Sequence, residues 1–275
     1  MVRPAASSIA VSLCLGEFLH CWSACRKSHY AGGFPKSPGA KAQLVNQSDS
    51  LIVFVTGANK GIGRETVRQL AIRGARVFLG ARNREAGEKT ASEIGGNVSF
   101  VEIDVTNPEM IERSAAHIFA NTGHLDVLVN NAGVLGAGDD SVLTVDAELA
   151  SRTFETNVLG PLRVTRSCVT LLAKSRAPRI INVSSGGGQL SSMNHWAPAY
   201  SVSKAALNAL TRQFAAALPH CAVNSVCPGW VRTAMGGSAA PRSVEEGADT
   251  IVWLAAEAPQ TLTGKFLRDR QVIDW

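Results

Sequence analysis

The body of this sequence has little net charge, and most of the excess of cations lies in residues 1–50. Charged residues make up 18% of the 275 positions, and the formal net charge is +5. Residues 1–50 contain five cations and two acids, so the rest of the chain carries only +2. Binding to nucleic acid requires lysines and arginines concentrated on one face. We therefore expect no nucleic-acid partner.

Cysteines are also few, and their spacing does not suit a metal. The chain has six, and the three near its N-terminus lack paired CxxC spacing and a second group of ligands. We expect no metal site. The other three lie in apolar surroundings and are expected to be packed thiols of a reducing compartment: Cys168, Cys221 and Cys227.

Long hydrophobic runs are missing as well. The apolar run 9–16 is too short to cross a bilayer and ends at Glu17, so we expect no membrane span. Residues 1–50 are poor in acids and end in a Pro/Gly/Lys segment, 33–39, which suits a linker. We interpret residues 1–50 as an N-terminal extension, either a transit peptide or an untargeted linker, with a secretory signal as the alternative. The protein is expected in the cytoplasm or an organelle.

Residues 51–275 contain neither repeats nor low-complexity tracts and are expected to form a single domain. Strand-like runs alternate with helical patterns, and Asn107-Pro108 and Ser243 with Glu246 are typical helix starts. Such alternation predicts an α/β fold with a parallel sheet covered by helices on both faces. We expect a Rossmann-type, doubly wound sheet of about seven strands, ending near residues 264–267.

A glycine-rich turn links the first expected strand to the first expected helix. The segment 56–63 reads TGANKGIG and directly follows the β-branched run 51–55. Gly57 permits a tight turn, and Gly61 and Gly63 let backbone N–H groups and the positive helix end approach phosphates. This order predicts a dinucleotide pyrophosphate site.

The end of the second expected strand, 76–80, indicates which dinucleotide binds. An NAD site has an acidic residue there for the ribose 2′-hydroxyl, whereas this chain has Arg82. Arg82, together with Lys60 in the glycine turn, can hold a 2′-phosphate. We expect the cofactor to be NADPH/NADP+.

Tyr200 and Lys204 are four residues apart in a stretch that reads as helix, so they share one face. Two unit charges about 4 Å apart interact by roughly 4 kcal/mol at an effective dielectric near 20, or about three pKa units. We expect the ammonium to bring the phenol's pKa towards neutrality. The pair would then be a proton donor.

These motifs occur in order along residues 51–275. Because they occur together, the chain resembles the short-chain dehydrogenase/reductase family. The resemblance rests on the glycine turn, the Tyr200/Lys204 pair and four further motifs: Asn130-Asn-Ala-Gly133, Asn157, Ser184-Ser185 and Pro228-Gly229. Within the family, the segments 227–237 and 243–248 are most similar to NADPH-dependent carbonyl reductases.

The resemblance implies a proton-relay tetrad of Asn157, Ser185, Tyr200 and Lys204. Tyr200 would exchange the proton, Ser185 would bind the reacting oxygen, Lys204 would hold the ribose, and Asn157 would hold a water linking Lys204 to solvent. Ser185 lies fifteen residues before Tyr200, slightly more than is usual in the family. Ser184 is therefore the alternative.

The resemblance, and the crevice expected at the carboxyl ends of parallel strands, also imply a set of cofactor contacts. These are Gly57, Asn59, Lys60, Gly61, Ile62, Gly63, Arg82, Asp104, Val105, Asn131, Ala132, Gly133, Tyr200, Lys204, Pro228, Gly229, Val231 and Thr233. An apolar substrate pocket is expected from Met193, His195, Trp196, Trp230 and Met235.

The implied activity is NADPH-dependent reduction of a ketone or aldehyde, a small-molecule substrate, to an alcohol. Two alternatives stay open. One is a 3-oxoacyl thioester reductase of the same family, and the other is a non-catalytic NADPH-binding regulatory protein. The family contains both tetramers and monomers, so a homo-oligomer and a monomer are both compatible with the sequence.

Overall fold

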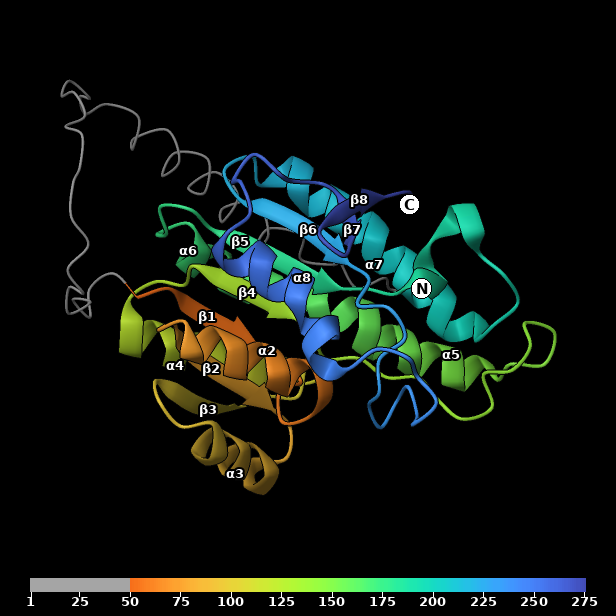
Figure 1. Cartoon of the computed structure of the whole chain (residues 1–275), viewed down its shortest axis with the longest axis horizontal. Helices are drawn as coiled ribbons and strands as arrows, with labels where there is room; N and C mark the ends of the chain where they lie inside the picture. Colours follow the sequence, from red (N-terminus) through yellow and green to blue (C-terminus); the bar gives the residue numbers. More distant parts are fainter. Residues whose placement is uncertain (1–49) are drawn as a thin grey trace, which may run out of the picture. The chain divides into compact units, whose positions relative to one another are not determined.

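The computed structural model describes residues 50–275 (Figure 1). The predictions for residues 1–49, which include the targeting segment and three of the cysteines, lie outside the described residues. The remaining cysteines are buried free thiols, as expected. Within the described part of the chain, no helix is long and apolar enough to cross a membrane.

The sheet confirms the predicted fold class. Its spatial order is β3-β2-β1-β4-β5-β6-β7-β8, and all pairs are parallel except β7 with β8. The strands are β1 (Ile52–Val55), β2 (Arg76–Ala81), β3 (Val98–Glu102), β4 (Val127–Asn130), β5 (Arg179–Val183), β6 (Ala222–Val226), β7 (Phe266–Arg268) and β8 (Gln271–Ile273).

The prediction of about seven strands is corrected to eight. β8 returns antiparallel to β7 through Asp269 and Arg270, which both have positive φ angles of 50° and 60°. Such a two-residue turn usually contains glycine or asparagine, and this turn has neither, so no hairpin is expected here from the sequence. The extra strand lies at the edge of the sheet.

Helices cover both faces of the sheet (Figure 1). One face packs against α2 (Gly61–Ile72), α3 (Arg84–Ile94) and α8 (Val244–Ala256). The other packs against α4 (Pro108–Thr122), α6 (Gly160–Leu172) and α7 (Pro198–Ala217). A further helix, α5 (Ala147–Phe154), continues through a π-helical turn, Glu155–Leu159, into α6.

Alternation along the strands explains this two-sided core. In β1, Val53 and Val55 face the α2/α8 layer, whereas Ile52 and Phe54 face the α4/α6 layer. The predicted helix starts are confirmed, since Asn107 caps α4 and Ser243 forms a capping box with Glu246 at α8.

The order in which successive strands are added to the sheet reverses at β1: β2 and β3 lie on one side of β1, and β4 and the later strands lie on the other. In doubly wound sheets a ligand crevice opens at this point, beyond the carboxyl ends of the strands. The glycine turn follows β1, and the Asn130-Asn-Ala-Gly133 segment follows from β4, so both lie at this crevice.

Candidate active site

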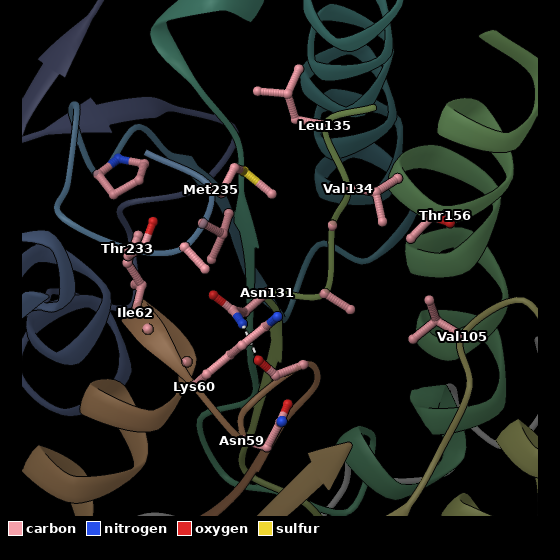
Figure 2. A pocket seen from close by; sticks show the side chains of 18 of the residues that line it. Asn59, Lys60, Ile62, Val105, Asn131, Val134, Leu135, Thr156, Thr233 and Met235 are labelled. Carbon is pink, nitrogen blue, oxygen red and sulfur yellow. Dashed lines mark hydrogen bonds between the residues drawn. The ribbon is translucent and has the colours of Figure 1, made fainter. Parts of the chain in front are cut away.

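A cavity of about 770 Å³ lies at the reversal of strand order. Figure 2 shows Ile62, Thr233 and Met235 on one side of it and Val105, Val134 and Thr156 on the other. Most of the predicted cofactor residues line it: Gly57, Asn59, Lys60, Gly61, Ile62, Gly63, Arg82, Asp104, Val105, Asn131, Ala132, Gly133, Tyr200, Lys204, Pro228 and Thr233.

The glycine turn packs tightly against the loop that follows β4. A Cβ on Gly57, where φ is +63°, would lie 2.7 Å from the Ala132 Cα, and one on Gly63 would lie 2.4 Å from Asn131 Nδ2. Asn131 Nδ2 donates hydrogen bonds to the carbonyls of Thr56 at 2.9 Å and Gly57 at 3.0 Å. No larger residue fits at either glycine without moving this turn.

The N-terminus of α2 is left without a cap and opens onto the cavity. Lys60 is its N-cap residue but makes no side-chain cap hydrogen bond, and the first turn contains no acid. By contrast, α3, α4, α5 and α8 each have a capping side chain and an acid in the first turn. Free N–H groups and the helix dipole therefore favour an anion at α2.

Arg82 stands at the edge of the cavity with 81% of its side chain exposed. Its NH1 lies 3.7 Å from Asp104 Oδ2, and Asp104 Oδ1 accepts hydrogen bonds from the amide and hydroxyl of Thr106. Burial raises the pKa of Asp104, but the Thr106 hydrogen bonds and the Arg82 charge outweigh it and hold that pKa below its usual value. The Arg82 guanidinium is therefore accessible to an anion in the cavity.

Tyr200 and Lys204 are both buried on α7, at 7% and 4% exposure. The Lys204 Nζ lies 5.5 Å from the Tyr200 ring centroid and donates to the Val183 carbonyl at 2.8 Å. The predicted helical spacing is confirmed, and the two side chains lie side by side at the cavity wall.

The predicted lowering of the Tyr200 pKa is wrong. Burial raises the pKa of Tyr200 to about 12, although a hydrogen bond with Ser185 opposes this. Burial also lowers the pKa of Lys204 to about 8. The ammonium is directed at the Val183 carbonyl, so desolvation dominates the phenol.

The two adjacent serines have different contacts. Ser185 hydrogen-bonds Tyr200 through its side chain, and its Oγ accepts from the Gly187 amide at 3.1 Å. Ser184 lines the cavity, but its Oγ donates to the Lys204 carbonyl at 3.3 Å. These contacts favour Ser185 as the serine that acts with Tyr200. The longer spacing to Tyr200 is accommodated by two short 3₁₀ turns, Gly186–Gly188 and Leu190–Ser192.

Asn157 lies in the π-helical turn and is fully buried behind the cavity. Its Nδ2 donates to the Val134 carbonyl and the Ser203 hydroxyl at 2.9 and 3.0 Å, and its Oδ1 accepts from the Val134 amide at 2.8 Å. A Cβ on Gly133 would lie 3.3 Å from Asn157 Oδ1 and 3.4 Å from Lys204 Nζ. Asn157 therefore joins the loop after β4 to α7, which contains Ser203.

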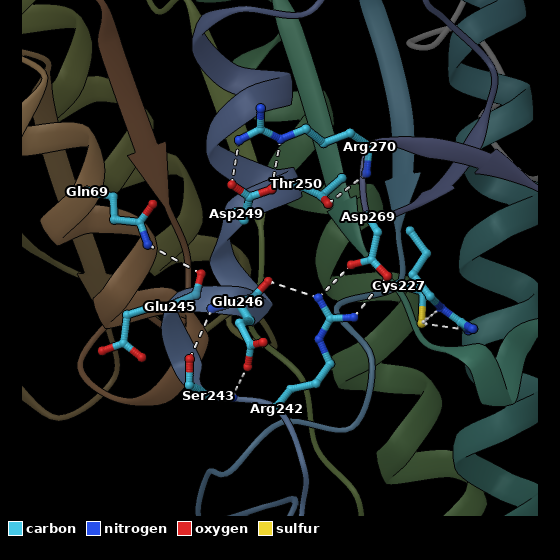
Figure 3. A network of polar contacts seen from close by, with 11 residues as sticks. Gln69, Cys227, Arg242, Ser243, Glu245, Glu246, Asp249, Thr250, Asp269 and Arg270 are labelled. Atoms are coloured by element: carbon cyan, nitrogen blue, oxygen red, sulfur yellow. Dashed lines mark hydrogen bonds and ion pairs between the residues drawn. The ribbon is translucent and has the colours of Figure 1, made fainter.

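The loop after β6 is anchored by Arg242, whose guanidinium lies between Asp269 and the Glu246 carbonyl (Figure 3). Backbone hydrogen bonds join Arg242 to Trp230 and Arg232. A Cβ on Gly229, where φ is +80°, would lie 2.5 Å from the Arg242 Cδ. Gly229 and the buried Val231, both predicted as cofactor contacts, do not line the cavity and instead shape this loop.

Of the predicted substrate residues, only Met235 lines the cavity. Trp196 packs edge-to-face on Tyr200, with ring centroids 5.7 Å apart. Trp230 donates its indole N–H to the Gly236 carbonyl, and both tryptophans are exposed. Met193 and His195 are exposed in the loop before α7 and do not line the cavity.

Several residues that line the cavity are not among the predicted site residues. They are Ile103, Thr106, Val134, Leu135, Thr156, Val183, Arg232, Ala234 and Val244. Most of them directly precede or follow a motif residue in the chain, as Thr156 does Asn157. A position next to a motif residue is therefore the sequence signal that could have identified them.

Comparison with known proteins agrees with this geometry. The family model for short chain dehydrogenases matches residues 51–243. The chain therefore belongs to the short-chain dehydrogenase family, whose members are oxidoreductases that use nicotinamide cofactors.

Individual relatives make the likeness more specific. The chain is 34% identical over 286 residues to a (+)-neomenthol dehydrogenase of Arabidopsis thaliana, covering 80% of this chain and 97% of that protein. The NADPH-bound carbonyl reductase from chicken fatty liver superposes with a TM-score of 0.75 at 29% identity, covering 82% and 99% of the two chains. Salutaridine reductase from Papaver somniferum gives 0.72 at 30% identity, covering 80% and 99%. This chain is thus a carbonyl-reductase-like oxidoreductase.

Proposed function

We propose that the protein reduces a ketone or aldehyde to an alcohol with NADPH, and that Tyr200 donates the proton. The observation that carries the proposal is the buried Tyr200–Lys204 pair, joined to Ser185, on the wall of a cavity that also contains the uncapped start of α2. One cavity can thus hold a dinucleotide and present a proton donor.

The chain's own residues fit NADPH. The glycine turn leaves room that a Cβ would fill, and the free N–H groups of α2 suit a pyrophosphate. Lys60 and the exposed Arg82 both line the cavity and would bind the 2′-phosphate. The loop containing Pro228 and Thr233 would border the nicotinamide, and the bound cofactor would supply the hydride.

Tyr200 suits the role of general acid. With a pKa raised to about 12 it stays protonated across the physiological range. An alkoxide is a much stronger base than a phenolate, so the proton transfer remains favourable. The Ser185 hydroxyl would hydrogen-bond the reacting oxygen and orient the carbonyl.

Lys204 and Asn157 would support this transfer. With a pKa lowered to about 8, Lys204 is mostly protonated at pH 7, and its charge would stabilise the phenolate left on Tyr200. Asn157 holds the Gly133–Val134 segment beside Lys204. The ribose hydroxyls would lie in this region.

The test is a Tyr200→Phe variant assayed by loss of NADPH absorbance. A panel of quinones, diketones, aldehydes and acetoacetyl thioesters would find a substrate. Phenylalanine keeps the ring packed against Trp196 but removes the proton, so kcat should fall by about 10²- to 10⁴-fold while NADPH still binds. Unchanged turnover would contradict the proposal.

The same panel separates the two alternatives. Activity confined to the thioesters would favour a 3-oxoacyl thioester reductase. Tight NADPH binding without turnover of any member would favour a regulatory protein. The complete set of Tyr200, Lys204, Ser185 and Asn157 supports the catalytic proposal over the second alternative.

A further inference from the structure

Asp139 is a buried aspartate six residues after the Asn130-Asn-Ala-Gly133 motif, and it is not itself part of any motif named above. It lies in the loop between β4 and α5 and is only 6% exposed. Its Oδ1 accepts from the Ala199 amide and its Oδ2 from the Tyr200 amide, both at 2.8 Å. Both carboxylate oxygens therefore bind the first turn of α7, across a separation of sixty residues.

Helix α7 has no cap of its own. Its N-cap residue, Ala197, has no side-chain acceptor and adopts a left-handed conformation, with φ 44° and ψ 67°. Pro198 follows and has no N–H. The next two amides are those of Ala199 and Tyr200, and Asp139 accepts from both. A carboxylate at this position also interacts favourably with the positive end of the helix dipole.

One of these amides belongs to Tyr200 itself, so Asp139 fixes the backbone from which the phenol projects. The loop of Asp139 also contains Val134 and Leu135, which line the cavity. Asn157 holds the start of this loop through two hydrogen bonds to the Val134 backbone. Asp139 and Asn157 thus both join this loop to α7, and Asp139 does so at the turn from which the phenol projects.

We propose that Asp139 is a positioning residue that sets the direction in which the Tyr200 hydroxyl meets the substrate carbonyl. It does not touch the reacting atoms and acts through the first turn of α7. This inference rests on the proposed function, in which Tyr200 donates the proton. A shift of about 1 Å in a reacting group can cost about 100-fold in rate.

The test compares Asp139→Asn with Asp140→Asn. Asparagine keeps the size of the side chain but places an NH₂ group against one of the two amides. Asp140 is the adjacent aspartate and is exposed, so its variant is a matched control for charge. Thermal melts show the temperature at which each variant is fully folded. NADPH titration then gives the dissociation constant and the fraction of binding-competent sites.

We expect Asp139→Asn to lower kcat by about 10- to 100-fold, with the NADPH dissociation constant and site fraction within about twofold of the parent. The solvent deuterium isotope effect on kcat should increase, because proton transfer becomes slower. Asp140→Asn should behave as the parent. A kcat for Asp139→Asn within about twofold of the parent would overturn the proposal, as would a loss matched by an equal loss of NADPH sites.

A second measurement does not depend on finding a substrate. Tyr200 is the only tyrosine besides Tyr30. In a Tyr30→Phe background, ¹³C-labelling of tyrosine at Cζ alone therefore gives one NMR signal, from Tyr200. Asp139→Asn should shift or broaden this signal, whereas Asp140→Asn should not. An unmoved signal would overturn the role of Asp139. Absence of turnover by the parent, with the signal moved, would refute the proposed function alone.

Discussion

Lys204 gives the sharpest prediction, because burial lowers its pKa into the working range of an enzyme. A pKa of about 8 means that about nine-tenths of the molecules have a protonated Lys204 at pH 7 and about one-tenth at pH 9. If the ammonium supports proton donation by Tyr200, then kcat/KM for NADPH should be flat below pH 7. It should fall about tenfold per pH unit above pH 8.

The assay is the rate of NADPH oxidation at saturating carbonyl substrate between pH 6 and pH 10, since kcat/KM reports the free enzyme. Tyr200 should contribute nothing in this range, because its pKa is raised to about 12. Lys204→Arg is the control. Arginine stays charged, so its profile should stay flat to pH 10 even if the rate is lower throughout. A parent profile that is flat to pH 10, or the same fall in Lys204→Arg, would refute the reasoning.

The buried ammonium should also make folding stability depend on pH. The unfolded chain binds the Lys204 proton more tightly than the folded chain, because the folded pKa is lowered from 10.5 to about 8. The resulting penalty is complete below pH 8 and is relieved as pH rises towards 10.5. The free energy of unfolding should therefore rise by about 2 kcal/mol between pH 8 and pH 10, relative to Lys204→Met. Urea titrations that show no such difference would contradict the burial argument.

Three further tests address other parts of the site. Ser185→Ala should lower kcat by about 100-fold with NADPH binding intact, whereas Ser184→Ala should change kcat much less; the reverse order in steady-state kinetics would move the role to Ser184. Arg82→Asp should raise the NADH-to-NADPH ratio of kcat/KM by at least about tenfold, because a carboxylate repels the 2′-phosphate, and an unchanged ratio would remove Arg82 from the cofactor site. Gly63→Ala should weaken NADPH binding by at least about tenfold in a fluorescence titration, because its Cβ would lie 2.4 Å from Asn131 Nδ2. Undiminished affinity would show that the turn can move.

Features that depend on residues close together in the chain could be predicted from the sequence. The glycine turn and the spacing of Tyr200 and Lys204 depend on neighbours in the chain, and the structure places them together as predicted. The alternation of strands and helices defined the fold class for the same reason. The resemblance to a known family then supplied the tetrad.

What the sequence could not supply depends on contacts between distant segments. The direction of the Tyr200 pKa shift follows from burial, which spacing along a helix does not reveal. Asp139 caps α7 from sixty residues away, so no capping pattern precedes the helix. The β7–β8 hairpin has no glycine or asparagine in its turn, and β8 was therefore missed.

The uncapped N-terminus of α2 would link the stability of the folded protein to the concentration of the proposed dinucleotide cofactor. Where a helix begins without a capping side chain, its free backbone N–H groups can donate hydrogen bonds to an anionic ligand. A ligand present at about 100 times its dissociation constant stabilises the native form by about 2.7 kcal/mol. At high concentrations of this nucleotide the protein would thus unfold less often and be degraded more slowly, whereas at low concentrations it would be degraded sooner.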